Sequence, residues 1–153
     1  MQRCSSAVLV ISLLSVAGCS RETVVHDFST PQGAILCLED AYRAKDLEAA
    51  VKCKDFRLEA RLMLEKLGTP KEELDEMVKL TADVLELGFR KELQEDGFPD
   101  FRGVTSHFPH TEPAGDNVVT VTEECAHASG QKSTNKLLVG KSSDGWRVLN
   151  PVE

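Results

Sequence analysis

The chain has 153 residues and a formal net charge of −7 at neutral pH, because acidic side chains outnumber basic ones. This acidic balance excludes a protein that binds nucleic acid through its phosphates, since such proteins need a basic surface. After removal of any leader, the length is sufficient for one globular domain with a buried core.

Residues 1–18 have the pattern of a secretory signal peptide. Basic Arg3 precedes an apolar run over residues 7–17, which is shorter than the roughly 20 residues of a membrane-spanning helix. The run ends in Val16-Ala17-Gly18-Cys19, which resembles the lipobox of bacterial lipoproteins. That resemblance implies cleavage before Cys19 and attachment of lipid to its thiol.

The implied lipid would tether the mature chain to a membrane. Two or three acyl chains anchor a protein stably, whereas one chain holds it only marginally. Ser20 stands where lipoproteins retained in the inner membrane typically have aspartate. We therefore expect a location in the cell envelope, lipid-anchored and facing the periplasm, with the outer membrane favoured. Residues 19–29 are expected to form the lipidated tether, and residues 30–153 the domain.

Helical patterns dominate the first part of this domain. Thr30-Pro31 is typical of a helix start, with proline at the first helical position, and Asp46 can cap a second helix. Thr69-Pro70-Lys71-Glu72 matches a capping box. Apolar residues at spacings of three and four predict helices over residues 31–45, 47–51, 56–67 and 71–95. The apolar side of the last helix is predicted to be Leu74, Met77, Val78, Thr81, Val84 and Leu85.

After Gly97 the pattern favours strands. They are predicted over residues 101–108, 118–128, 136–141 and 146–149. Ser142-Ser143-Asp144-Gly145 indicates a tight hairpin turn between the last two. Helices first and antiparallel strands last predict an α+β fold.

Two local sequences, in this order of elements, resemble the nuclear transport factor 2-like (cystatin-like, α+β cone) superfamily. The first runs from Ala41-Tyr42-Arg43-Ala44-Lys45-Asp46 into the second helix, and the other is Asp144-Gly145-Trp146-Arg147-Val148. The resemblance implies N-terminal helices packed on a curved antiparallel sheet that encloses a cone-shaped cavity. Residues 34–64 also resemble superfamily members of the immunity-protein type, which neutralise secreted toxins.

Two cysteines flank the corner between the first two helices. Cys37 and Cys53 lie at nearly equal distances from Lys45-Asp46, so an antiparallel helical hairpin would bring them level. A disulfide is permitted outside the cytoplasm and would contribute on the order of 3 kcal/mol. The alternative is two small buried thiols, which is common for cysteine.

Glu123, Cys125 and His127 alternate along a predicted strand and therefore share one face. Cysteine and histidine with a carboxylate could bind a metal ion, or Glu123 and His127 could act as a general base and its partner. A third interpretation is polar residues at the margin of the sheet beside a buried thiol. The sequence has no CxxC, HExxH or nucleophile-elbow motif. We predict no cofactor, no bound metal and no catalytic residue.

These patterns favour a non-enzymatic, membrane-tethered periplasmic binding module with a protein partner, such as an immunity protein that recognises a toxin. Loss of Arg3 with the leader brings the net charge to about −8, which suits a basic partner. The alternative is a small enzyme or small-molecule binder that uses the cone cavity. In that case Tyr42, Glu123 and His127 would line the cavity.

Overall fold

The computed structural model describes residues 24–150, which form four helices followed by four strands. The helices are α1 (Pro31–Ala44), α2 (Leu47–Lys52), α3 (Phe56–Lys66) and α4 (Lys71–Glu95). The strands are β1 (Thr105–Gly115), β2 (Val118–Ala126), β3 (Lys132–Ser142) and β4 (Gly145–Leu149). This order confirms the predicted α+β class. None of the helices in the described residues combines the length and apolar composition needed to span a membrane.

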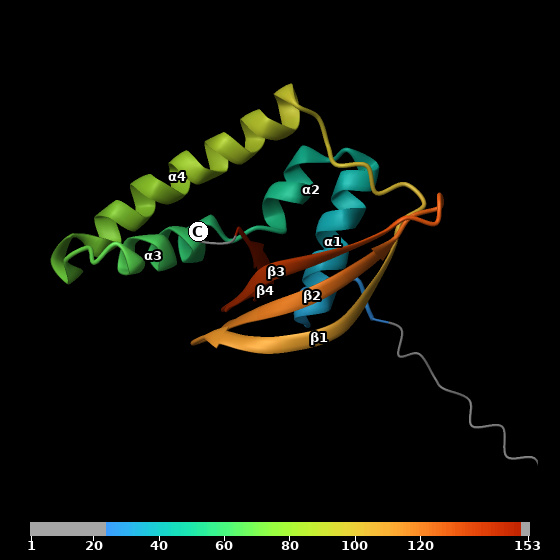
Figure 1. The fold of residues 1–153 in the computed structure, drawn as a ribbon. Helices are drawn as coiled ribbons and strands as arrows, with labels where there is room; N and C mark the ends of the chain where they lie inside the picture. Colours follow the sequence, from blue (N-terminus) through green and yellow to red (C-terminus); the bar gives the residue numbers. More distant parts are fainter. Residues whose placement is uncertain (1–23, 151–153) are drawn as a thin grey trace, which may run out of the picture.

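The strands form one antiparallel sheet in the order β1-β2-β3-β4. Figure 1 shows a curved sheet with α1 against one face, while α3 and α4 project away from it as a helical hairpin. The register pairs Val119 with Val139, and Ser142 with Gly145 at the last turn. The prediction of helices packed on a curved antiparallel sheet is therefore confirmed.

β1 differs from its prediction, because it begins at Thr105 and continues to Gly115 instead of ending at Phe108. Pro109 and Pro113 lie within it, and the register shifts between His107 and His110. Proline lacks a backbone donor, but β1 is an edge strand, so only one side of it needs ladder hydrogen bonds. The edge position explains why two prolines do not end this strand.

The first two helices are capped as the sequence predicts. The Thr30 side chain accepts a hydrogen bond from the Gly33 amide at 3.0 Å, and Asp46 accepts one from the Ala49 amide at 3.0 Å. Lys45 ends α1 in the left-handed conformation, with φ of 54°. The capping box predicted for α4 is wrong: Pro70 is the N-cap residue, and no side chain of residues 24–150 caps this helix.

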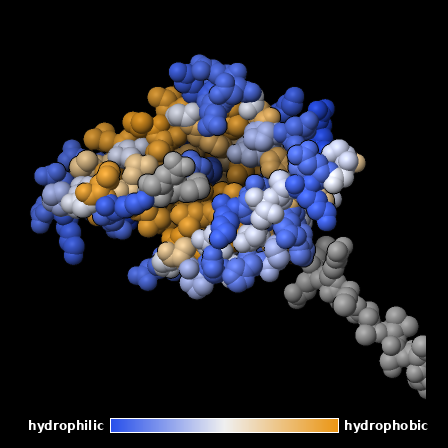
Figure 2. Space-filling model, in the orientation of Figure 1, coloured by the Kyte–Doolittle hydropathy of each residue, from blue (hydrophilic) through white to orange (hydrophobic). Residues whose placement is uncertain are grey.

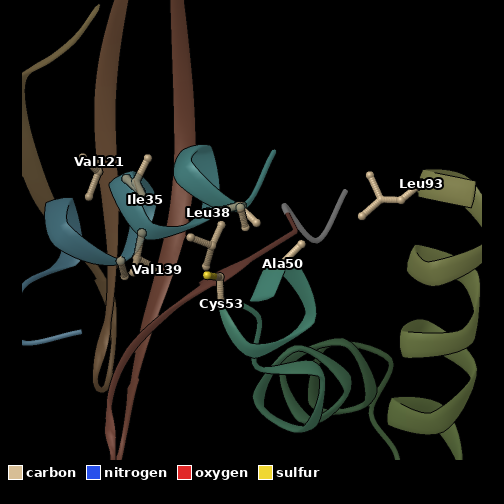
Figure 3. Packing of buried hydrophobic residues seen from close by; sticks show 10 residues of the cluster. Ile35, Leu38, Ala50, Cys53, Leu93, Val121 and Val139 are labelled. Atoms are coloured by element: carbon tan, nitrogen blue, oxygen red, sulfur yellow. The ribbon is translucent and has the colours of Figure 1, made fainter. Parts of the chain in front are cut away.

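The main core lies between α1 and the sheet. Ala34, Ile35 and Ala41 of α1 pack with Val121 and Val139 from the sheet. Figure 3 shows Cys53, from the end of α2, directed toward Leu38 of α1. Side chains from both layers fill this space, so α1 and the sheet form one packed pair of layers.

A second core holds the α3–α4 hairpin together. It consists of Phe56, Ala60, Leu64, Leu74, Val78 and Ala82. Phe89 of α4 packs on Phe56 with ring centroids 5.7 Å apart, and Phe89 also contacts the main core. The hairpin therefore has an apolar interior of its own, joined to the rest of the domain near the C-terminal end of α4.

The predicted apolar side of α4 is partly wrong. Leu74 and Val78 are buried against α3, but Met77 is 37% exposed and Val84 is 68% exposed. At about 3.6 residues per turn, Met77 lies at the edge of the face formed by Leu74 and Val78, and Val84 lies about 120° around the helix from Val78. α4 therefore carries two apolar faces, and residues 24–150 cover only one of them.

The N-terminal segment is fixed to the last hairpin of the sheet. The Trp146 amide donates to the Phe28 carbonyl at 2.9 Å, and the Arg147 guanidinium lies 3.7 Å from the centroid of the Phe28 ring. Gly145 has φ of 116°, and a Cβ there would lie 2.5 Å from the Phe28 oxygen. Only glycine suits both the turn and this close approach.

Candidate functional site

The face of the sheet that α1 covers holds a polar cluster within an otherwise apolar layer. Glu123 and Cys125 of β2 are both buried there, beside Val121. Glu39 of α1, with 2% of its surface exposed, faces them. The inner polar cluster consists of Glu39, Arg43, Ser106, Glu123, Cys125 and Asn135.

Hydrogen bonds connect most of this inner polar cluster. The Asn135 side-chain amide donates to Glu123 Oε2 at 3.0 Å, and its nitrogen lies 3.7 Å from Cys125 Sγ. Arg43 donates to Glu39 Oε2 at 2.6 Å and to the Phe101 carbonyl at 3.2 Å. These donors satisfy one oxygen of each buried carboxyl group.

The remaining two oxygens, Glu39 Oε1 and Glu123 Oε1, are buried without a donor among the described residues. Burial, followed by a hydrogen bond with Glu123, raises the pKa of Glu39 to about 7, against opposing contributions from Ser106 and Arg43. A hydrogen bond between two carboxyl groups requires a proton, because ionised carboxylates only accept. Glu39 can therefore carry the proton of that hydrogen bond up to about pH 7.

The three residues predicted to line a cavity have separate surroundings. Tyr42 packs in an aromatic group, 6.3 Å from the ring centroid of Phe98 and 6.0 Å from that of Phe101. Burial raises the pKa of Tyr42 to about 12, so its hydroxyl stays protonated. His127 lies beyond the end of β2, where its amide donates to the Gln131 carbonyl in the turn to β3. Its place in a turn separates His127 from the buried stretch of β2.

Among residues 24–150, Cys37, Cys53 and Cys125 are not bonded to one another in the structure. Burial, followed by the nearby Cys37, raises the pKa of Cys53 to about 12. Burial also raises the pKa of Cys125. Such thiols carry little thiolate at neutral pH and are poor nucleophiles. The Cys37–Cys53 disulfide stays a prediction, and Cys19 lies outside the described residues.

A more open site lies at the base of the α3–α4 hairpin. Two adjacent cavities there have volumes of about 390 Å³ and 520 Å³, and Asp55 and Arg57 line both. Their walls come mainly from α3 and α4, and we call them together the hairpin cleft. Its lining residues are Val51, Lys54, Asp55, Phe56, Arg57, Leu58, Arg61, Asp75, Val78, Lys79, Ala82, Asp83 and Glu86. None of the three predicted cavity-lining residues belongs to it.

A buried ion pair supports the floor of the hairpin cleft. Lys54 Nζ lies 3.6 Å from Glu59 Oε2, and both side chains are 2% exposed. Lys54 also donates to the Asn150 side-chain oxygen at 2.7 Å, while the Asn150 amide donates to Glu59 at 2.9 Å. Burial lowers the pKa of Lys54, and the Glu59 carboxylate opposes this effect. These contacts connect α3 to the end of β4.

Charged groups of both signs surround the cleft. Arg61 of α3 donates to Asp75 of α4 at 2.7 Å and thus joins the two helices across its edge. Arg57, Lys79 and Asp83 are exposed on the same rim. Among residues 24–150, no group of three potential metal-binding side chains is arranged to hold an ion. The arrangement provides an open surface with apolar, positive and negative contacts.

Sequence reasoning missed Glu39, Asn135 and the Lys54–Glu59 pair. Glu39 has a local signal, since it follows Ile35 by four residues on the buried side of α1. Asn135 pairs directly with Glu123 across the β2–β3 ladder, but only the register shows this. Lys54 and Glu59 carry no signal that separates them from exposed charges.

Comparisons with known proteins add little to this geometry. No protein-family model matches the sequence, and no curated protein matches it. Among solved structures, the chain is similar to one described as "Putative NTF2-like transpeptidase" from Campylobacter jejuni, with 10% sequence identity and a TM-score of 0.42. The match covers 80% of this chain and 100% of that one. A likeness of this size carries no information on activity.

Proposed function

We propose that this protein is a non-enzymatic, membrane-tethered binding module of the cell envelope, with a nuclear transport factor 2-like domain. The observation that supports it best is the hairpin cleft, which combines Phe56 and Leu58 with charged groups of both signs. Protein-binding surfaces typically have such an apolar centre with a polar rim. Figure 1 shows the hairpin of α3 and α4 projecting away from the sheet, and most residues that line the cleft belong to these two helices.

The membrane tether is proposed from the lipobox-like residues 16–19, which lie outside the described part. The immunity-protein form of the proposal has a secreted toxin as the partner. Its support is the resemblance of residues 34–64 and the net charge of −7, which steers basic proteins toward the surface. The cleft itself is of mixed charge, so we expect steering by the whole surface and docking by shape and individual ion pairs.

The test is capture of a partner from envelope extract with the full-length chain, repeated with a variant of the cleft rim. Arg57→Glu with Lys79→Glu reverses two exposed charges on the rim, whereas Lys132→Glu with Lys136→Glu reverses two exposed charges on β3 as a matched control. We expect the unchanged chain and the control to retain a specific protein that the rim variant loses. No retained protein, or equal capture by the rim variant, would contradict the proposal.

The immunity-protein form has a sharper test of its own. If a gene for a secreted toxin adjoins this one, the toxin should kill cells that lack this chain and spare cells that express it. The rim variant should then lose protection while the control on β3 keeps it. Killing that is unaffected by the chain would remove the toxin from the proposal and leave the binding module standing.

The alternative is acid–base chemistry on a small molecule in the cone. A glutamate with a pKa of about 7 favours it, because a general acid–base group works best near the ambient pH. However, Glu39 and Glu123 are each only 2% exposed, and neither lines the hairpin cleft. The buried Glu39 carboxyl therefore suits a structural role under α1 better than contact with a substrate.

A further inference from the structure

The uncovered apolar face of α4 has a regular spacing. Its members are Met77, Leu80, Val84 and Leu87, which are 37%, 59%, 68% and 68% exposed. The steps between them are three, four and three residues, which is the spacing of the contact positions in a two-helix coiled coil. We call these four residues the α4 stripe. Figure 2 shows hydrophobic residues gathered along the middle of α4, with hydrophilic groups toward both of its ends.

This face is not needed for the fold of the chain. The side of α4 that packs on α3 is formed by Leu74, Val78 and Ala82, each at most 8% exposed. The hairpin cleft uses yet another side, represented by Lys79 and Glu86. Scattered exposed apolar residues need no explanation, but a contiguous row with coiled-coil spacing indicates a surface for another helix.

We propose that the α4 stripe binds the α4 stripe of a second copy of this chain, with the two helices antiparallel. In the register centred on Ala82, Met77 lies opposite the other copy's Leu87, and Leu80 lies opposite its Val84. In heptad notation, Met77 and Val84 are a positions, and Leu80 and Leu87 are d positions. Each layer of the antiparallel pair then contains one a and one d residue, as antiparallel coiled coils require. The α4 stripe of one copy therefore fits the α4 stripe of a second copy that runs in the opposite direction.

The charges at the ends of the stripe fit the same register. Glu73 and Lys91 are exposed and extend the three–four spacing by one step at either end. In the antiparallel pair, Glu73 of one copy lies opposite Lys91 of the other, and this contact occurs twice. A parallel pair would place Glu73 opposite Glu73 and Lys91 opposite Lys91. The charge pattern therefore selects the antiparallel arrangement and selects this chain as the partner.

The size of the contact makes the dimer weak. From Met77 to Leu87 the stripe is about 15 Å long, which is well below the dimension of a standard protein interface. Asp83 also lies near the two-fold axis, where two like charges approach each other. We therefore expect a reversible dimer, favoured when copies are concentrated on one surface.

Crosslinking in cells that express the full-length chain tests the proposal. Two differently tagged variants, Met77→Cys and Leu87→Cys, are co-expressed and treated with a short, membrane-permeable bismaleimide. The antiparallel register brings these two positions together, whereas two copies of residue 77 lie about 15 Å apart along the axis. We expect crosslinks between Met77→Cys of one copy and Leu87→Cys of the other. As a control, Leu67→Cys replaces Met77→Cys; this position is exposed beyond the end of α3, and the crosslinks should then be lost. The unchanged chain gives the background from its own thiols.

Charge reversal supplies a second measurement that no misfolding can imitate. Glu73→Lys and Lys91→Glu should each weaken the crosslinking by about fivefold, since each turns two exposed attractions into repulsions. The double variant restores both attractions and should recover the original yield. Crosslinks only between identical variants, crosslinks to a different protein, or no crosslinks would each overturn the proposal. So would a double variant that stays as weak as the single ones.

Discussion

The raised pKa of Glu39 should make the stability of this protein fall as the pH rises. The pKa of Glu39 is raised from 4.5 to about 7 by burial and by its hydrogen bond with Glu123. A group whose pKa is raised on folding contributes stability that is complete below its unfolded value. That stability is lost as the pH rises through its folded value. The relevant window therefore runs from about pH 4.5 to pH 8.

The magnitude follows from the two pKa values. One pKa unit corresponds to about 1.4 kcal/mol, so between pH 5 and pH 8 this group alone should cost about 2.5 kcal/mol of stability. The substitution Glu39→Gln replaces the titrating group by an amide that donates to Glu123 at every pH. It also keeps an oxygen that can accept from Arg43, at the cost of the ionic part of that contact. The variant should therefore show a much flatter pH dependence than the unchanged chain.

The assay is urea unfolding at pH 5, 6, 7 and 8 for the unchanged chain, Glu39→Gln and the exposed control Glu76→Gln. Subtracting the variant from the unchanged chain removes the contribution of every other titrating group. The carboxyls with lowered pKa, such as Asp144, oppose the trend mainly below this window. If Glu39→Gln keeps the slope of the unchanged chain, or if that slope is absent, the raised pKa of Glu39 is refuted.

Three further outcomes are expected. Lys54→Met should destabilise the fold by about 3–5 kcal/mol in urea unfolding, because it leaves the Glu59 carboxylate buried without its cation. A loss of stability below about 1 kcal/mol would contradict a buried ion pair. Gly145→Ala should cost about 1–3 kcal/mol in thermal or urea unfolding, given φ of 116° and the oxygen 2.5 Å from the new Cβ. Thiol counting by mass spectrometry without reductant should find Cys37 and Cys53 unreactive and joined, and two alkylated thiols would rule out the disulfide.

Local signals in the sequence were sufficient for much of the fold. Thr30 and Asp46 cap their helices through their own side chains, so the information lies within three residues of each cap. The turn before Gly145 likewise depends on one glycine in a left-handed conformation. Such features do not require knowledge of the neighbours in space, and their predictions are confirmed.

The errors and omissions concern contacts between distant segments. Pro109 is compatible with a strand only because β1 is at the sheet edge, which no local pattern reveals. Met77 and Leu74 are both apolar, and only the position of α3 decides which of them is buried. Glu39 joins Glu123 across 84 residues of sequence, and periodicity carries no information on such pairs. The chemistry of the candidate sites is therefore less predictable than the elements that hold it.

The attachment of Phe28 to the last hairpin has a mechanical consequence. The described chain begins beside β4, while the turn between α3 and α4 lies at the far end of the molecule (Figure 1). A load applied to the N-terminus would act first on the contact of His26 with Asp40 of α1, and then on the contacts of Phe28 with Arg147 and with the Trp146 amide. α1 and the last hairpin of the sheet would therefore share that load. The turn between α3 and α4 lies outside this path, whereas the floor of the cleft is linked to the end of β4 through Asn150.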